Sequence, residues 1–323
     1  MRRFFDPVYL LGLTFYLVLR FVFGDQFWWL SLVNTFAPFV FFPLPFILLG
    51  SWMKNRSWQR FLATGLAVYA LVWFGPYFLP KGKQTAASST FTVLSYNMHD
   101  LTDGLYAKLE TLEPDIVLLQ EVPQTLLDDL PPRMGKLYPH RLAQSPLYKG
   151  NAVLSRYPIT ASEALTGFGE YVPQRLELLI EDRTVAVYNV HLTWPIGKRR
   201  LPRRFSPGPV RLLSSYDDSG RNRDLDALAQ LLEGETLPFI VGGDFNLSQH
   251  SAGYSRIANL ANDSFRERGW GWGNTWYLHP RLPPLLRIDY LWHSESLETI
   301  EAQVEPRMAS DHLAIRASFA FRE

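Results

Sequence analysis

The stretch PFIVGGDFN, residues 238–246, is a short apolar run that ends in a carboxylate and an amide. Its branched side chains and its two closing glycines predict a buried β-strand over Leu237–Gly243. Asp244 and Asn246 follow that strand directly. Side chains that follow a strand project from a rigid element into the cleft at that edge of the sheet, so this is a candidate site.

The same arrangement recurs from residue 91 onward. Further strands are predicted over Phe91–Tyr96, Asp115–Gln120, Ala152–Ser155, Arg175–Glu181, Thr184–His191, Ile288–Trp292 and Leu313–Phe319, and helices over Tyr106–Glu113 and Arg221–Glu233. Polar residues lie at the strand ends, namely Asn97, Glu121, His191, Asp289, Asp311 and His312. Each alone has an ordinary explanation, because Asp and Asn often end strands as turn formers. The pattern predicts a sheet-rich α/β or α+β domain of about 235 residues.

Together these motifs resemble the endonuclease/exonuclease/phosphatase superfamily, the deoxyribonuclease I-like proteins. The resemblance covers about residues 91–320 and is carried by SYN (95–97), DIVLLQEV (115–122), GNAVLSRYP (150–158), NVHL (189–192), GGDFN (242–246), RIDYLW (287–292) and SDHLAI (310–315). It implies a four-layer α/β sandwich, in which two central β-sheets face each other and helices lie outside.

The resemblance also implies hydrolysis of phosphate esters with a divalent metal ion, usually Mg²⁺, with Mn²⁺ as the other candidate. Glu121 is then the principal metal ligand, and Asn97 and Asp311 lie close to it. All three offer the hard oxygen donors that Mg²⁺ prefers. The chain has no cysteine, which excludes disulfides and thiolate ligands.

Five residues receive catalytic roles from the same resemblance. Asp244 positions or deprotonates the attacking water, and Asn246 holds that water or the phosphate. His191 and His312 flank the phosphate, and Asp289 orients the His312 ring. The resemblance leaves open which residue is the general base.

Asn151 and Arg156, in the GNAVLSRYP motif, are candidate substrate-binding residues. Arg156 has an alternative role in a salt bridge at a strand end. His99 lies two residues beyond Asn97 and could line the cleft, although a loop role is the simpler interpretation.

Residues 1–80 have a different composition from the rest of the chain. They contain only eight charged residues and carry a net charge of +4, whereas residues 81–323 carry −3. No charged residue occurs from Gln26 to Met53 or from Phe61 to Pro80. Each stretch is long enough for a membrane-spanning helix, which needs roughly 20 apolar residues. Pro7–Leu19 is a shorter candidate, so three spans are expected, with two as the alternative.

The basic residues flanking these spans predict their orientation. Arg2-Arg3 and the loop Lys54–Arg60 are basic and are expected in the cytoplasm by the positive-inside rule. Three spans then place the domain after residue 81 outside the cytoplasm. Lys81 and Lys83 argue weakly for the opposite orientation.

The predicted organisation is therefore a transmembrane region over residues 1–80, a polar linker over 81–90 and a catalytic domain over 91–323. A proline-rich segment at 195–216 carries six basic residues and no acidic one. It is either a solvated loop or a basic rim that binds an anionic substrate or anionic lipid.

The sequence as a whole predicts a membrane-anchored, divalent-metal-dependent phosphoesterase. The substrate is a phosphodiester of nucleic acid or of a phospholipid headgroup, and the expected partners are that substrate and the bilayer; the residues indicate no protein partner. The alternative is a catalytically silent binding module on the same fold, since a fold alone does not establish activity.

Overall fold

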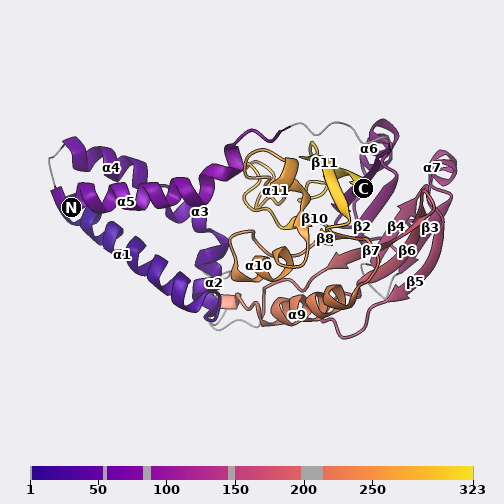
Figure 1. The fold of residues 1–323 in the computed structure, drawn as a ribbon, viewed down its shortest axis with the longest axis horizontal. Helices are drawn as coiled ribbons and strands as arrows, with labels where there is room; N and C mark the ends of the chain where they lie inside the picture. The colour runs from indigo at the N-terminus through magenta and orange to yellow at the C-terminus, as the bar shows by residue number, and fades with distance from the viewer. Residues whose placement is uncertain (1, 54–56, 83–88, 145–149, 198–213, 323) are drawn as a thin grey trace. The chain divides into compact units, whose positions relative to one another are not determined.

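The computed structural model describes residues 2–53, 57–82, 89–144, 150–197 and 214–322. The chain forms two compact units (Figure 1). The first, here called the helical unit, comprises Met1–Pro80, Ile196–Asp217 and Ser248–Ala252. The second, the sheet unit, comprises Lys81–Pro195, Asp218–Leu247 and Gly253–Glu323. The middle of the predicted linker, the first three residues (54–56) of the basic loop predicted at Lys54–Arg60, and most of the basic segment, 198–213, lie outside the described residues.

The helical unit is built from apolar helices. They are α1 (Arg2–Phe23), α2 (Trp28–Thr35), α3 (Ala37–Val40), α4 (Leu44–Met53) and α5 (Ser57–Phe74), and the 3₁₀ turn η1 (Gly75–Phe78) follows α5. The segments Phe5–Phe23 and Ser57–Phe78 are each long and apolar enough to cross a membrane. The two helical segments Trp28–Thr35 and Ala37–Met53 meet at an angle of 81°. If both together cross the membrane as one broken span, the chain has three spans. Pro38 lies in the first turn of α3, where proline is tolerated because its missing N–H has no partner there.

Apolar side chains lie both inside and outside this unit. Leu10, Leu30 and Ala63 are fully buried, whereas Phe21 is 94% exposed and Phe61 84% exposed. A water-soluble surface rarely carries such large apolar side chains side by side, so the described outer faces have the composition of a lipid-facing surface.

The sheet unit contains two six-stranded sheets (Figure 1). The first has the order β11 (Leu297–Val304), β12 (Ile315–Phe321), β1 (Phe91–Asn97), β2 (Ile116–Val122), β4 (Gly150–Ser155) and β3 (His140–Gln144). The second has the order β5 (Ile159–Ala164), β6 (Gln174–Ile180), β7 (Arg183–His191), β8 (Phe239–Asp244), β10 (Asp289–His293) and β9 (Asn262–Asp263). Only β1/β2 and β7/β8 pair in parallel among the described strands.

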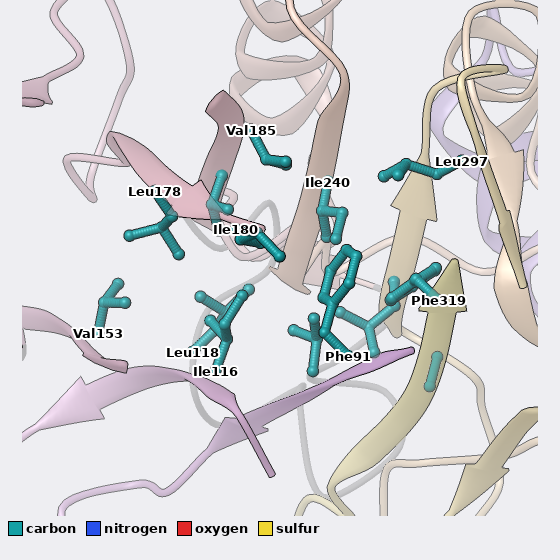
Figure 2. Close-up of a cluster of buried hydrophobic side chains, with 14 of the residues drawn as sticks. Phe91, Ile116, Leu118, Val153, Leu178, Ile180, Val185, Ile240, Leu297 and Phe319 are labelled. Atoms are coloured by element: carbon teal, nitrogen blue, oxygen red, sulfur yellow. The ribbon is translucent and has the colours of Figure 1, made fainter. Parts of the chain in front are cut away.

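The two sheets pack face to face with helices on their outer sides. Alternate residues of the strands, such as Ile116 and Leu118 of β2 and Val185 of β7, meet in one buried apolar cluster (Figure 2). The intervening residues of β2, Val117 and Leu119, pack against the outer helices α6 (Leu105–Leu112) and α7 (Pro132–Leu137). The second sheet is covered in the same way by α9 (Ser219–Gly234) and α10 (Ala252–Ala258), and α11 (Ser264–Arg268) contributes Phe265 to the central cluster. The predicted four-layer sandwich is confirmed.

Every strand and helix predicted in this unit is present, with ends displaced by at most two residues. Within the described residues, the sequence prediction missed four strands, β3, β5, β9 and β11, and three short helices, α7, α10 and α11.

The strand directions bring the polar strand ends to one edge. In the parallel pair β1/β2, Asn97 lies opposite Gln120, and in β7/β8 His191 lies opposite Asp244. Asp289 begins the antiparallel strand β10 and also lies opposite Asp244. The segment before β12 lies beside the end of β1, because Ser95 pairs with Ile315. Residues more than 200 positions apart in sequence thus share one edge of the sandwich.

The backbone immediately before Asp244 leaves no room for a side chain. Gly243 has φ +147°, and a Cβ atom there would lie 1.8 Å from the Val190 carbonyl oxygen. Gly243→Ala should therefore lower the free energy of unfolding by roughly 3 kcal/mol. Thermal unfolding of the purified full chain in detergent, followed by circular dichroism, measures this loss. The control is Gly234→Ala at the end of α9, where a Cβ meets nothing within 4 Å. Equal midpoints for the two variants would contradict the steric argument.

Candidate active site

The carboxylate of Asp244 is the centre of a cluster of polar side chains from both sheets. Its Oδ2 accepts a hydrogen bond of 3.0 Å from the Asn97 amide, which belongs to the other sheet. The same oxygen lies 3.5 Å from His191 Nε2 and 3.7 Å from His312 Nε2. Complete burial raises the pKa of Asp244 to about 7, against the opposing effect of the His312 charge. A carboxyl group with this pKa can take up and release a proton near neutral pH.

His312 is held between two buried carboxylates. Its Nδ1 lies 3.0 and 3.1 Å from the two oxygens of Asp289, and its Nε2 faces Asp244. Burial alone would lower the pKa of His312, but the charges of Asp289 and Asp244 outweigh it and raise the pKa to about 10. The ring is therefore a cation at neutral pH, with one N–H directed at Asp289.

Glu121 lies at a distortion in β2. The register of β2 against β4 shifts between Leu119 and Val122, and Glu121 adopts φ +50°. A bulge of this kind turns a side chain away from the direction that a regular strand would give it. The carboxylate of Glu121 is directed at His99, whose Nδ1 lies 3.3 Å from Oε2. The same His99 nitrogen lies 3.9 Å from Asp311 Oδ1, so the two carboxylates converge on one point.

Asn97 connects the Glu121 group with Asp244. Its amide nitrogen donates to Asp244 and lies 3.5 Å from Glu121 Oε1, and its Oδ1 accepts from the backbone N–H of His99. The side chain is fully buried. This single amide therefore sets the positions of both carboxylates.

His191 is buried beneath the ring of Tyr171. The two rings are stacked with centroids 3.6 Å apart and an interplanar angle of 14°. The stack sets the plane of the imidazole, whose Nε2 lies 3.5 Å from Asp244 and 3.9 Å from Glu121. Tyr171 lies on the loop between β5 and β6.

Asn246 lies in the turn that follows Asp244 and hydrogen-bonds its carboxylate. Its backbone N–H donates to Asp244 Oδ1 at 2.8 Å, and its side-chain amide donates to the Leu192 carbonyl at 2.9 Å. Its φ of +49° is a conformation that asparagine tolerates better than most residues. Asn151 is buried at the start of β4, where its amide donates to the Asn189 carbonyl at 3.3 Å, and its contact with substrate stays a prediction.

The structure does not bring Arg156 to this cluster. Its guanidinium lies 3.5 Å from Asp115 and 3.3 Å from Glu113, just before β2 begins, whereas Glu121 lies near the end of that strand. Six residues of strand separate the two positions by roughly 20 Å. Arg156 therefore forms the salt bridge at a strand end that the sequence predicted as its alternative role.

Several residues of the cluster were missed or undervalued by the sequence prediction. His99 is a site residue by position, and its spacing of two from Asn97 was the available signal. Tyr171 has no local signal, because only the tertiary structure brings it to His191. The Thr275 hydroxyl accepts from the backbone N–H of Asp289, and the Trp276 indole donates to Asp311 at 3.3 Å.

Two sets of residues in this region have the composition of a metal site. Asp244, Asp289 and His312 lie close enough together to share an ion. In this set the His312 ring is already bonded to Asp289 through Nδ1, so we interpret it as a hydrogen-bonded triad. The second set is Glu121, Asp311 and Asn97, whose oxygen donors suit Mg²⁺ or Mn²⁺.

Comparison with known proteins agrees with this geometry. The model of the Endonuclease/Exonuclease/phosphatase family matches residues 94–312, which is more than half of the chain. The chain belongs to this family. Members of the endonuclease/exonuclease/phosphatase family hydrolyse phosphate esters, generally with divalent metal ions. No protein of curated function matches the chain in sequence.

Solved structures share the fold of the sheet unit. One is a humanized TDP2 from D. rerio with 14 mutations, at TM-score 0.56 and 17% identity, covering 72% of this chain and all of the other. An endonuclease/exonuclease/phosphatase from Bacteroides vulgatus has TM-score 0.56 and 15% identity, covering 73% and 100%. The catalytic domain of human Nocturnin with bound sulfate has TM-score 0.52 and 19% identity, covering 75% and 97%. At these identities the likeness establishes the fold.

The contact between Asp289 and His312 predicts a measurable change in proton affinity. Asp289→Asn removes the charge that does most to raise the pKa of His312, so that burial dominates and the pKa should fall from about 10 toward about 6.5 or lower. Histidine NMR titration of the purified protein in chelator measures this value. Asp128→Asn, at an exposed position, is the matched control. An unchanged His312 titration in Asp289→Asn would contradict the assignment of the charge effect.

Proposed function

We propose that this protein is a membrane-anchored, divalent-metal-dependent hydrolase of phosphodiester bonds. The observation that carries the proposal is the convergence of two carboxylates, Glu121 and Asp311, beside a buried Asp244 flanked by two imidazoles. Such an arrangement combines a candidate cation-binding site with groups that can accept and donate protons. Phosphoryl transfer to water requires both, because the charge of the phosphate must be stabilised and the attacking water must lose a proton.

The residues present fit a divalent ion. Glu121 and Asp311 lie 3.3 and 3.9 Å from the same His99 nitrogen, so two like charges lie near each other, an arrangement that a cation stabilises. Asn97 lies beside Glu121 and carries a neutral amide oxygen, Oδ1, which accepts from the His99 backbone N–H in this structure. These three residues would hold Mg²⁺ or Mn²⁺. When bound there, the ion would offset the negative charge of the phosphate and polarise it toward attack.

The remaining side chains supply the proton chemistry. Asp244, with its pKa raised to about 7, would accept the proton of the attacking water, and the amides of Asn97 and Asn246 hold its carboxylate in place. His312, as a cation oriented by Asp289, would donate a hydrogen bond to a phosphate oxygen as negative charge develops. His191, whose Nε2 lies 3.5 Å from Asp244, would donate a further hydrogen bond to the phosphate.

The alternative is a catalytically silent binding module on the same fold. A binding module needs the fold and a surface, and it has no need for a carboxyl group held near neutral pKa between two imidazoles. The intact set of Glu121, Asp244 and His312 therefore favours an enzyme.

The metal role of Glu121 is tested by Glu121→Gln, which keeps the shape of the side chain and removes its charge. Turnover of the soluble diester bis(p-nitrophenyl) phosphate in Mg²⁺ should fall by about 100-fold or more, and Mn²⁺ binding followed by electron paramagnetic resonance should weaken. Asp244→Asn and His312→Ala should each cost about 100-fold in turnover.

The matched control is Glu163→Gln, which removes a carboxylate from the exposed strand β5 and should change neither turnover nor Mn²⁺ binding. Full turnover in excess chelator, or in Glu121→Gln, would overturn the metal assignment.

We infer that residues 1–80 anchor the chain in a membrane, that 81–90 link it and that 91–323 are the catalytic domain. Support comes from the two helices that are long and apolar enough to span, and from their exposed apolar side chains. The basic residues at Arg2-Arg3 and Lys54–Arg60 favour a cytoplasmic location for those segments. The catalytic domain is then expected outside the cytoplasm.

This orientation is tested by protease added to intact cells or spheroplasts that express the chain. Residues 91–323 should be degraded without lysis, while a cytoplasmic marker protein stays intact. Protection of the domain until lysis would reverse the orientation, and the same experiment with a tag at the N-terminus reports the other side.

A further inference from the structure

Two segments that follow catalytic strands belong to the helical unit. Ile196–Asp217, described at 196–197 and 214–217, follows β7, the strand that ends in His191. Ser248–Ala252 follows β8, the strand that ends in Asp244. The packing of these two segments with the helices is therefore a feature of the helical unit itself.

The first anchor is an aromatic enclosure around His250. Its ring lies 5.7 Å from the ring of Trp73, 5.6 Å from Phe74 and 6.0 Å from Tyr77, measured between centroids. The rings of Trp73 and Phe74 meet it edge to face, at 89° and 87°. These contacts come from the end of α5 and from η1, and His250 is 3% exposed.

The second anchor is a group of hydroxyls on α2. The Tyr216 hydroxyl lies 3.2 Å from Ser31 Oγ and 3.4 Å from Thr35 Oγ1, and Thr35 Oγ1 lies 3.4 Å from Ser251 Oγ. All four side chains are buried. Polar side chains on an apolar helix are costly to bury unless they have partners, and here the partners come from both segments.

A third anchor lies at the turn between α1 and α2. Asp25 accepts a hydrogen bond from the Ala252 backbone N–H, and it also accepts from the Asn34 amide. Asn34 in turn accepts from the Tyr16 hydroxyl at 2.9 Å. Polar residues of the helical unit thus hold the Ser248–Ala252 segment through hydrogen bonds.

Chain length alone limits how far the catalytic residues can be from these anchors. His250 follows Asp244 by six residues. Ile196 follows His191 by five residues and is joined to the anchor residue Tyr216 by an isolated β-bridge. At about 3.6 Å for each residue, these two connections span at most about 22 and 18 Å.

We propose that the substrate is the phosphodiester of a membrane phospholipid headgroup, hydrolysed at the surface of the bilayer that holds the helical unit. This inference rests on the proposed function of the same site. Water supplies the oxygen of the new P–O bond, one ester P–O bond breaks, and the leaving alcohol takes a proton, giving a phosphate monoester.

The physical reason is the cost of moving acyl chains into water, which grows with their apolar area and keeps the lipid phosphate at the bilayer surface. A site for this phosphate must stay near that surface. Two short anchored connections limit how far the site can lie from the helices, whereas a soluble nucleic acid can diffuse to a site at the end of any flexible linker.

The experiment compares substrates for the full chain reconstituted in vesicles with Mg²⁺. One set of vesicles holds phosphatidylethanolamine and phosphatidylglycerol in equal parts, and separate sets hold phosphatidylcholine, phosphatidylinositol or sphingomyelin. Lipid products are measured by mass spectrometry, beside bis(p-nitrophenyl) phosphate, plasmid DNA and RNA. We expect hydrolysis of at least one phospholipid, with Glu121→Gln inactive on it.

The outcomes separate the two proposals. If nothing is hydrolysed, including the soluble diester, the proposed function itself fails. If the soluble diester or a nucleic acid is hydrolysed and no phospholipid is, the proposed function stands and the lipid inference is overturned.

Anchor variants test the role of the segments. His250→Ala and the conservative Tyr216→Phe should lower phospholipid turnover by about tenfold because the segments that follow β7 and β8 lose their contacts with the helices. Soluble diester turnover should stay within about twofold, since the reacting groups are held by the sheets. His140→Ala, on the edge strand β3, is the matched control and should change neither. Equal losses on both substrates in both variants would overturn the orienting role.

Discussion

The hydrogen bond between Asn97 and Asp244 joins the two sheets at the point where the chemistry is proposed. It belongs to a small set of buried amides that cross the sheet interface, together with Gln120–Asn189 at 2.7 Å and Asn151–Asn189 at 3.3 Å. Below this layer the interface consists mainly of apolar side chains, which would tolerate small shifts. Buried amides do not tolerate such shifts, because burying a polar group without a hydrogen-bond partner costs free energy. The amides therefore determine how the edges of the two sheets align.

The distorted backbone around the cluster depends on that alignment. Glu121, His99 and Asn246 all adopt positive φ values near +50°, which cost free energy in residues other than glycine. Each is held by specific bonds: Asp100 N–H to the Glu121 carbonyl, His99 N–H to Asn97, and Asn246 N–H to Asp244. The stability of the rest of the fold offsets the free-energy cost of these positive φ angles. In this backbone conformation the carboxylates and imidazoles face one another.

The strands missed by the sequence prediction share a physical cause. β3 and β5 are edge strands, β3 with mostly half-buried and β5 with mostly exposed side chains, and β9 is only two residues long. β11 reads LETIEAQV, which mixes residues of high helix propensity with an alternating apolar pattern. Edge strands are selected by pairing with a neighbour more than by their own composition, so local sequence carries a weak signal for them.

The sequence by itself determined the central strands, the family and most of the polar residues of the site. Buried strands need uninterrupted apolar runs, and the candidate site residues lie at or beside the ends of those runs, so both can be recognised in the linear sequence. Only the tertiary structure decided that His99 joins Glu121 and Asp311, that Tyr171 stacks on His191, and that Arg156 pairs at the opposite end of β2. It also decided that Ser248–Ala252 belongs with the helices. These contacts depend on loop conformation and on strand pairing between distant segments. Neither can be recognised from the spacing of residues in the sequence.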